Sequence, residues 1–239
     1  MSVTLVIPVL NEAKALPRLI AHLAALSPAP AEILAVDGGS TDETCALIEA
    51  AGWRLITAPR GRASQINAGV DAASHPIVCI LHADTIPPAD AVAVIERTLA
   101  DPRTALASFT PLIKGVKTRW CTSFHCWLKT WYVPLLLRPH LFARGGRLLF
   151  GDHAMFFRRA DFLAVGGCDP GMPVMEDADL SIKLTARGRV RLVPRLVETS
   201  DRRIAEWGVL KANWLYIKIG ALWALGARER LAEQYPDIR

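Results

Sequence analysis

The chain has 239 residues and a formal net charge of +5 at pH 7. Hydrophobic residues make up 51% and charged residues 21%, a composition that builds a buried core and excludes an intrinsically disordered protein. The length suits one large α/β domain. The net positive charge favours acidic partners such as nucleotide phosphates without selecting among them.

The first hundred residues alternate short apolar runs, which predict buried strands, with segments of helical periodicity. Strands are expected at 3–9, 32–36, 53–58 and 77–81, and helices at 13–26, 42–51, 64–74 and 89–99. This alternation is typical of βαβ units, so the predicted fold class is α/β: an open, mostly parallel sheet with helices on both faces.

The pattern changes after about residue 110. Aromatic and basic side chains mix over 112–145, and we then expect a strand at 147–158, a helix at 176–187 and a strand at 188–193. From Ile204 onward the chain is predicted to be helical.

The five cysteines are odd in number and form no Cys-x-x-Cys pair, which favours reduced thiols and a cytoplasmic protein. The start, MSVTLVIPVLNEA, has no basic region before its apolar run, so we interpret it as a strand rather than a signal peptide. No stretch reaches the roughly 20 apolar residues that a membrane span needs.

Polar residues gather after three of the predicted strands, where ligands of open α/β sheets bind. The three segments are PVLNE at 8–12, DGGSTD at 37–42 and HAD at 82–84. Asp37 can accept a hydrogen bond from a nucleobase imide, and Asp84 offers the hard oxygen ligand that Mg²⁺ or Mn²⁺ prefers. The structural alternative for each segment is a polar turn that caps the next helix.

Two arginines, Arg60 and Arg62, precede a predicted helix. Arginine binds phosphate oxygens through two hydrogen bonds, and a helix N-terminus also attracts anions. We assign phosphate binding to Arg62 and a solvated loop position to Arg60.

Two further stretches carry candidate chemistry. Glu176 and Asp177 begin a predicted helix, where acids also suit the helix dipole, but the apolar residues around them indicate the partial burial that suits a general base. In GDHAMFFRR, Asp152 and His153 can hydrogen-bond an acceptor or a sugar, and turn formation is the alternative.

In chain order, IPVLNEA, VDGGSTDET, LHADT, GDHAMFFRR and MEDADLSIKL resemble the GT-A glycosyltransferases of the family 2 type. The resemblance is closest to a small bacterial subgroup associated with radical-SAM and selenodomain proteins, and it extends to TSDRR at 199–203. It implies one GT-A-like domain over 1–239, with a nucleotide-sugar-binding half (1–110), an acceptor and catalytic half (111–203) and a helical tail (204–239).

The resemblance also implies an inverting transfer from a nucleotide diphosphate sugar, assisted by Mg²⁺ or Mn²⁺. Glu176 and Asp177 would supply the base, with Asp177 preferred, and Asp84 would hold the metal. Asp152 and His153 would face the acceptor or the sugar. The residues implied for nucleotide binding are Pro8, Glu12, Asp37, Arg62 and His82.

Three departures from the family pattern stand out. Asp37 is followed by Gly38 where many relatives have a second acid, and His82 replaces the first acid of an Asp-x-Asp motif. His153 stands where the subgroup usually has glutamine. The QxxRW signature of processive synthases is absent, which favours one sugar per encounter.

The segment 207–225 is rich in Trp, Leu and Ile and carries Lys211 and Lys218. Such a helix packs on the core, pairs with another subunit or lies in a membrane interface. The last of these would place the protein at the inner face of the membrane.

We expect a UDP-linked donor, with GDP or dTDP as alternatives. The acceptor is unidentified, and a lipid-linked hydroxyl is one candidate. Nucleic acid is not expected as a partner.

Two other functions fit parts of the pattern. The reduced number of acids suits a catalytically weak nucleotide-sugar-binding protein. A sugar-nucleotide nucleotidyltransferase has a similar sheet, but such enzymes open with a GGxGTRL-like loop where this chain has IPVLNE. No GxGxxG follows the first strand, which argues against a dehydrogenase.

Overall fold

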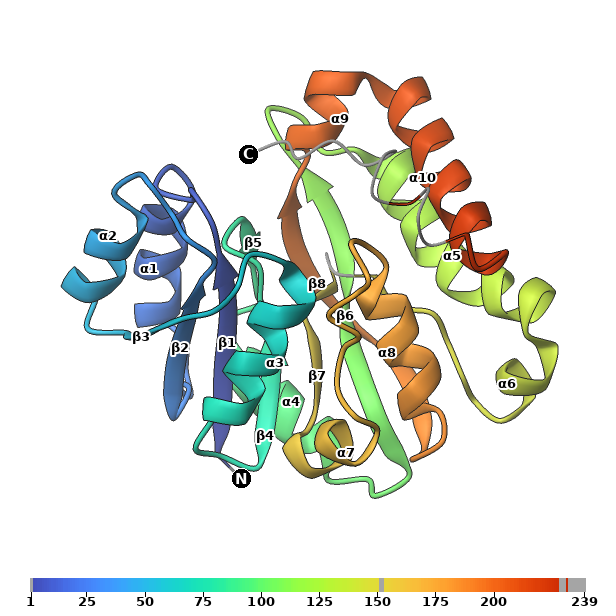
Figure 1. Cartoon of the computed structure of the whole chain (residues 1–239), viewed down its shortest axis with the longest axis horizontal. Helices are drawn as coiled ribbons and strands as arrows, with labels where there is room; N and C mark the ends of the chain where they lie inside the picture. Colours follow the sequence, from blue (N-terminus) through green and yellow to red (C-terminus); the bar gives the residue numbers. More distant parts are fainter. Residues whose placement is uncertain (1, 151–152, 228–230, 232–239) are drawn as a thin grey trace.

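The computed structural model describes residues 2–150, 153–227 and 231. Within them the sheet has eight strands in the order β3-β2-β1-β4-β7-β6-β8-β5 (Figure 1). Strands β3, β2, β1 and β4 are mutually parallel, as are β6 and β8, whereas β7 is antiparallel to β4 and β6, and β5 is antiparallel to β8. The expected mostly parallel sheet is confirmed. The strands are β1 (Val3–Val9), β2 (Glu32–Asp37), β3 (Arg54–Thr57), β4 (Ile77–Ile80), β5 (Thr85–Ile86), β6 (Thr104–Lys114), β7 (Met155–Arg158) and β8 (Arg189–Ser200).

Helices cover both faces of the sheet, as the sequence predicts. One face carries α1 (Leu16–Ala24), α2 (Thr44–Ala50) and α4 (Ala91–Leu99), and the other carries α3 (Arg62–Ala72), α7 (Arg159–Ala164) and α8 (Glu176–Leu184). The remaining helices gather beyond β6 and β8 (Figure 1); they are α5 (Trp120–Leu137), α6 (Pro139–Ala143), α9 (Arg202–Trp207) and α10 (Val209–Ala224). In the described part of the chain, no helix has the length and hydropathy to cross a membrane.

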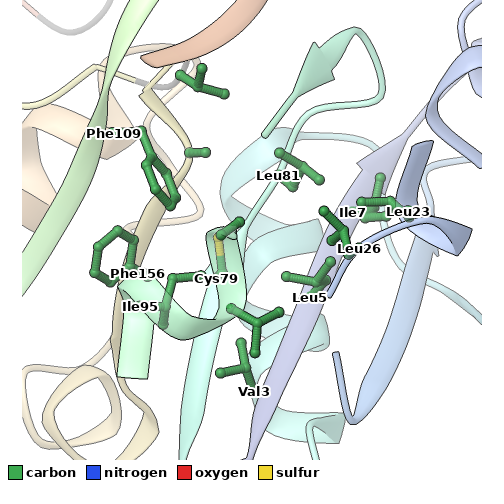
Figure 2. Close-up of a cluster of buried hydrophobic side chains, with 14 of the residues drawn as sticks. Val3, Leu5, Ile7, Leu23, Leu26, Cys79, Leu81, Ile95, Phe109 and Phe156 are labelled. Carbon is green, nitrogen blue, oxygen red and sulfur yellow. The ribbon is translucent and has the colours of Figure 1, made fainter. Parts of the chain in front are cut away.

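Strand β1 is buried on both of its faces, which explains why its sequence is continuously apolar. Successive strand residues point to opposite faces, so Leu5 and Ile7 join one buried cluster with α1 and α4, while Val6 joins the other with α3. Figure 2 shows Leu5 and Ile7 beside Leu23 in the first cluster. Full burial of a side chain of this size contributes about 1.5–3 kcal/mol, so both faces of β1 stabilise the sheet.

Helix α3 lies unusually close to the sheet because Gly69 has no side chain. A Cβ atom at Gly69 would overlap the side chain of Val6 and press on that of Val36. This close approach sets the helix so that its first residue, Arg62, stands near the carboxyl ends of β1 and β2.

The expectation of a strand over 147–158 is wrong for residues 147–150 and 153–154, while residues 151 and 152 lie outside the described part of the chain. Met155–Arg158 form β7, and Ala154 just before it has a positive φ of 48°, which interrupts an extended chain. Strand β6, which lies between β7 and β8, was not predicted from the sequence. In addition, β8 runs on to Ser200, beyond the predicted strand at 188–193.

Glu32, at the start of β2, ties several segments together. Its carboxylate accepts hydrogen bonds from the Thr4 hydroxyl (2.8 Å), the Ser74 N–H (2.9 Å) and Arg54 Nη1 (3.1 Å). Burial raises the pKa of Glu32, but these hydrogen bonds outweigh burial and lower the pKa from 4.5 to about 2. The ionised carboxylate therefore stabilises the fold.

Replacing Glu32 with glutamine is expected to destabilise the protein in a pH-dependent way. Because the folded-state pKa lies below the unfolded value, the stabilisation is complete above about pH 4.5 and is lost as the pH falls towards about 2. At neutral pH we expect Glu32→Gln to lower the free energy of unfolding by about 1–3 kcal/mol. Urea unfolding at several pH values measures this, and a gap between the two proteins that does not narrow in acid would contradict it.

Candidate active site

A cavity of about 620 Å³ opens at the carboxyl ends of β1 and β4, a volume that suits a small-molecule ligand. Residues after these strands, the starts of α3 and α8, and the end of β8 form one side, and α5 and α10 form the other. Six of the residues singled out from the sequence line it: Pro8, Glu12, Arg62, His82, Asp84 and Asp177.

Arg202, the first residue of α9, lies between two of these acids. Its guanidinium Nη2 is 3.2 Å from Glu12 Oε1 and 3.2 Å from Asp84 Oδ2. Burial lowers the pKa of Arg202, but the hydrogen bonds and charges of Glu12 and Asp84 raise it overall, so the side chain stays charged. Two carboxylates from the ends of β1 and β4 therefore converge on one cation.

The oxygen atoms of Asp84 and Glu12 fit a Mg²⁺ or Mn²⁺ ion in chemical type. Mg²⁺ is usually bound by one or two carboxylates together with substrate phosphates and water. Among the described residues, no group of three His, Cys, Asp or Glu side chains is placed to hold a metal. A metal here would thus need a bound diphosphate to complete its ligands.

Asp37 lies outside the cavity wall. Its buried carboxylate accepts hydrogen bonds from the N–H groups of Gly39 (3.0 Å) and Ser40 (3.1 Å). The loop so formed is joined to the loop after β1, because Asn11 N–H donates to Ser40 Oγ and Asn11 Oδ1 accepts from Thr41 N–H. In this structure Asp37 shapes the rim beside the cavity.

Gln65, on α3, connects the ends of β1 and β2. Its buried amide donates to the carbonyl oxygens of Val9 (2.7 Å) and Val36 (2.8 Å). Gln65 was not among the residues singled out from the sequence, where its signal was a polar side chain next to apolar Ile66 in a predicted helix.

Removing the Gln65 donors is expected to cost stability. Gln65→Met leaves two buried carbonyl groups without this donor, which should lower the free energy of unfolding by about 1–3 kcal/mol. Gln65→Glu should cost more, because it places a carboxylate against the same two oxygen atoms. Thermal unfolding of both variants measures this, and equal stability of the three proteins would contradict it.

The two acids at the start of α8 have different surroundings. Glu176 is buried and its Oε1 lies 3.2 Å from Arg62 Nη1, which ties α8 to α3. Asp177 lines the cavity, and its Oδ1 accepts a hydrogen bond from the N–H of Ala178 at 2.7 Å. Met175 directly before them has a positive φ of 70°, a strained conformation of the kind found at functional sites.

Of the two candidate acceptor residues, the structure describes His153. His153 is buried, and its ring packs edge-on against Phe150 at a centroid distance of 6.0 Å. Phe150 lines the cavity, whereas His153 does not. Asp152 lies outside the described residues.

The side of the cavity formed by α5 and α10 was not predicted from the sequence. Helix α5 contributes His125, Lys129 and Tyr132, and α10 contributes Tyr216 and Trp223. The two helices meet where Cys126 and Tyr216 pack against one buried cluster and where Lys129 Nζ lies 5.8 Å from the Tyr216 ring centre. The mixture of aromatic and basic residues in 112–145 was the available signal.

Comparison with known proteins gives related sequences and folds. Uncharacterised glycosyltransferases of Mycobacterium bovis and Mycobacterium tuberculosis are 40% identical over 84 residues, which is 35% of this chain and 37% of each relative. The match thus spans little more than a third of the length of these curated relatives.

Two solved proteins share the fold. S. aureus TarS has a TM-score of 0.64 at 15% identity, over 86% of this chain and 38% of TarS. Glucosyl-3-phosphoglycerate synthase from Mycobacterium tuberculosis, crystallised with Mn²⁺, UDP and phosphoglyceric acid, has a TM-score of 0.64 at 19% identity, over 94% of this chain and 78% of the synthase. These likenesses show the expected GT-A fold.

The model of the family described as "Glycosyl transferase family 2" matches residues 4–164, more than half of the sequence. This range includes β1 to β4 and the cavity residues that follow β1 and β4. The chain belongs to glycosyl transferase family 2.

Proposed function

We propose that this protein is an inverting, non-processive glycosyltransferase that moves a sugar from a UDP-linked donor to an acceptor hydroxyl. The observation that carries the proposal is one cavity lined by Asp177 and by the paired acids Glu12 and Asp84 with their cation Arg202. Family membership supports glycosyl transfer, and the structures of TarS with UDP-GlcNAc and of the mycobacterial synthase with UDP support the donor class.

In this proposal the nucleotide lies along the ends of β1, β2 and β4. Pro8 and His82 line its pocket, and Asp37 meets the base after a small opening of the loop that it now holds. Arg62 and Arg202 contact the diphosphate, since guanidinium groups match phosphate oxygens. Asp84 would hold Mg²⁺ or Mn²⁺, which would neutralise charge on the departing diphosphate.

The chemical step is a single displacement. Asp177 takes the proton of the acceptor hydroxyl, the acceptor oxygen forms a bond to the anomeric carbon, and the bond from that carbon to the diphosphate oxygen breaks on the opposite side. The electron pair leaves with UDP, whose new negative charge is stabilised by Arg62 and Arg202. The sugar is transferred with inversion.

The surroundings of the two acids favour Asp177 over Glu176 as the base. Glu176 is held by Arg62 and does not line the cavity, whereas Asp177 does. Glu176 is therefore a positioning residue that orients the arginine proposed to contact the diphosphate.

Hydrolysis of the donor by water tests this function without knowledge of the acceptor. The protein is incubated with a panel of UDP-sugars and Mn²⁺, and UDP release is measured. Proton NMR then identifies the anomer of the sugar formed first. Release of UDP with inversion supports the proposal, and release of pyrophosphate from a nucleoside triphosphate would instead favour a nucleotidyltransferase. UDP binding without any turnover would favour a catalytically weak binding protein.

We further propose that the chain belongs to the bacterial subgroup associated with radical-SAM and selenodomain proteins. The ordered motifs carry this assignment, with His153 in place of the usual glutamine. Because its ring packs against Phe150, which lines the cavity, His153 would act on acceptor choice through that aromatic ring.

A membrane contact through 207–225 also belongs to the proposal. Leu210 and Trp214 of α10 are exposed beside the exposed Lys211 and Lys218, a combination that suits an anionic lipid surface. Sedimentation with vesicles that contain phosphatidylglycerol tests this contact. The proposal would be contradicted if the protein sedimented equally with neutral and with anionic vesicles, or if it sedimented with neither.

A further inference from the structure

The two sides of the cavity differ in polarity. The side formed by the sheet ends carries the charged groups Glu12, Asp84, Asp177 and Arg202. The side formed by α5 and α10 carries the polar residues His125, Lys129, Tyr132, Asn213 and Tyr216 and, towards the ends of the two helices, an apolar part. This apolar part consists of Val133, Leu137, Ile217, Ile219, Trp223 and Leu225. A nucleotide diphosphate sugar accounts for the charged side and leaves the apolar part without a ligand group to match it.

The apolar part continues to the molecular surface. Leu137, Ile217 and Leu225 line the cavity and are nevertheless 52%, 56% and 82% exposed. Large apolar side chains at the rim of a pocket mark a binding groove, because their exposure to water is unfavourable. Helices α5 and α10, which lie side by side in Figure 1, thus form an apolar path that leads outward from the catalytic groups.

Two basic residues, Lys129 on α5 and Arg203 on α9, also line the cavity. Lys129 Nζ lies 4.0 Å from the centre of the Phe150 ring. Burial, and then the charge of Lys129, lower the pKa of His125 nearby, which keeps this histidine neutral at pH 7. These basic residues can hold a polar head group while a hydrocarbon chain extends along the helices.

We infer that the acceptor is an amphiphile, with its reactive hydroxyl at Asp177 and a hydrocarbon chain between α5 and α10. This inference rests on the proposed function, because it assigns the acceptor to the same cavity. The observation behind it is continuity, because the exposed apolar rim and Asp177 line one cavity. A sugar or small polar metabolite would leave the apolar rim without a partner.

Binding of n-alkyl β-D-glucosides tests the inference. Hexyl, octyl and decyl glucosides, below their critical micelle concentrations, are titrated into the protein with UDP and Mn²⁺ present, and methyl glucoside is the reference. Because each buried methylene adds free energy of transfer, we expect affinity to rise by about tenfold or more from the hexyl to the decyl compound.

Three variants test where the alkyl chain of the glucoside binds. Ile217→Asp and Leu225→Asp place a charge on the rim and should abolish most of the chain-length dependence. Phe124→Asp is the matched control, since Phe124 is 61% exposed on α5 but does not line the cavity, and it should keep the dependence. No dependence in the wild type, or an equal loss in the Phe124 variant, would overturn the inference.

A UDP titration of the same samples separates this inference from the proposed function. UDP binding without chain-length dependence means that the amphiphile assignment fails while the transferase proposal stands. Chain-length dependence without UDP binding means that the apolar groove binds amphiphiles but the proposed donor is wrong.

Discussion

Replacing Asp177 with asparagine is expected to reduce sugar transfer by about 10²–10⁴-fold, the usual contribution of a general base. Asparagine keeps the shape of the side chain and can still meet the Ala178 N–H through its oxygen, but it cannot take the proton of the acceptor hydroxyl. UDP release from the donor, with kcat and KM measured separately, checks this. The loss should lie in kcat, because Asp177 acts on the proton in the transition state.

Asp179→Asn is the matched control for this change. Asp179 lies in the same first turn of α8 and is paired with Lys183 at 3.0 Å, but it does not line the cavity. Its replacement removes the same charge from the same helix end and should leave kcat within about twofold. Equal losses in the two variants would show that α8 needs acidic residues for its structure and that Asp177 is not the base.

Replacing Asp84 with alanine is expected to remove the effect of Mn²⁺ on UDP binding. In wild-type protein, Mn²⁺ should tighten UDP binding by linking Asp84 to the diphosphate. Without the carboxylate, UDP affinity in Mn²⁺ should fall by at least about tenfold, since weakening even indirect support of a metal costs about 10–100-fold. Calorimetric titration with Mn²⁺ and with EDTA measures both values.

The structure offers a control for this variant as well. Asp90 forms an exposed ion pair with Arg195 at 2.9 Å and lies outside the cavity, so Asp90→Ala also removes an acid from an Asp–Arg pair. It should bind UDP like the wild type. In Asp84→Ala, Arg202 keeps its contact with Glu12, so the fold should persist. Metal-dependent UDP binding that survives in Asp84→Ala would contradict the assignment.

The local pattern of the sequence was sufficient to predict strands β1 to β4 and helices α1 to α4 close to their observed positions. The apolar runs of β1 and β4 end at polar residues, and parallel strands bring such ends to one edge, so Glu12 and Asp84 could be expected near each other. Strand β6 was missed because the segment TALASFTPLIK contains small and polar residues and a proline in place of a continuous apolar run.

The arrangement around Arg202 could not be derived in the same way. Arg202 is 190 residues from Glu12 and 118 from Asp84 in sequence, so their contact depends on the path of β8 and not on any local pattern. The same holds for the pairing of Arg62 with Glu176 between α3 and α8. Sequence motifs indicated the kinds of groups present, and the sheet order determined which of them meet.

The apolar side of the cavity depends on tertiary packing too. The mixed aromatic and basic composition of 112–145 fits a surface helix, a membrane helix or a pocket wall equally well. Only the placement of α5 against α10 shows that Tyr132 and Trp223 line the same cavity as Asp177. For this reason the acceptor class could be argued from the structure and not from composition.

Calorimetric titration of the wild-type protein with UDP, GDP and dTDP, each with Mn²⁺ and again with EDTA, shows whether this cavity binds a nucleotide diphosphate and which one. We expect tight binding of UDP that is weakened by EDTA, and much weaker binding of the other two nucleotides. Failure of all three nucleotides to bind under either condition would contradict the claim that this cavity holds a nucleotide-sugar donor.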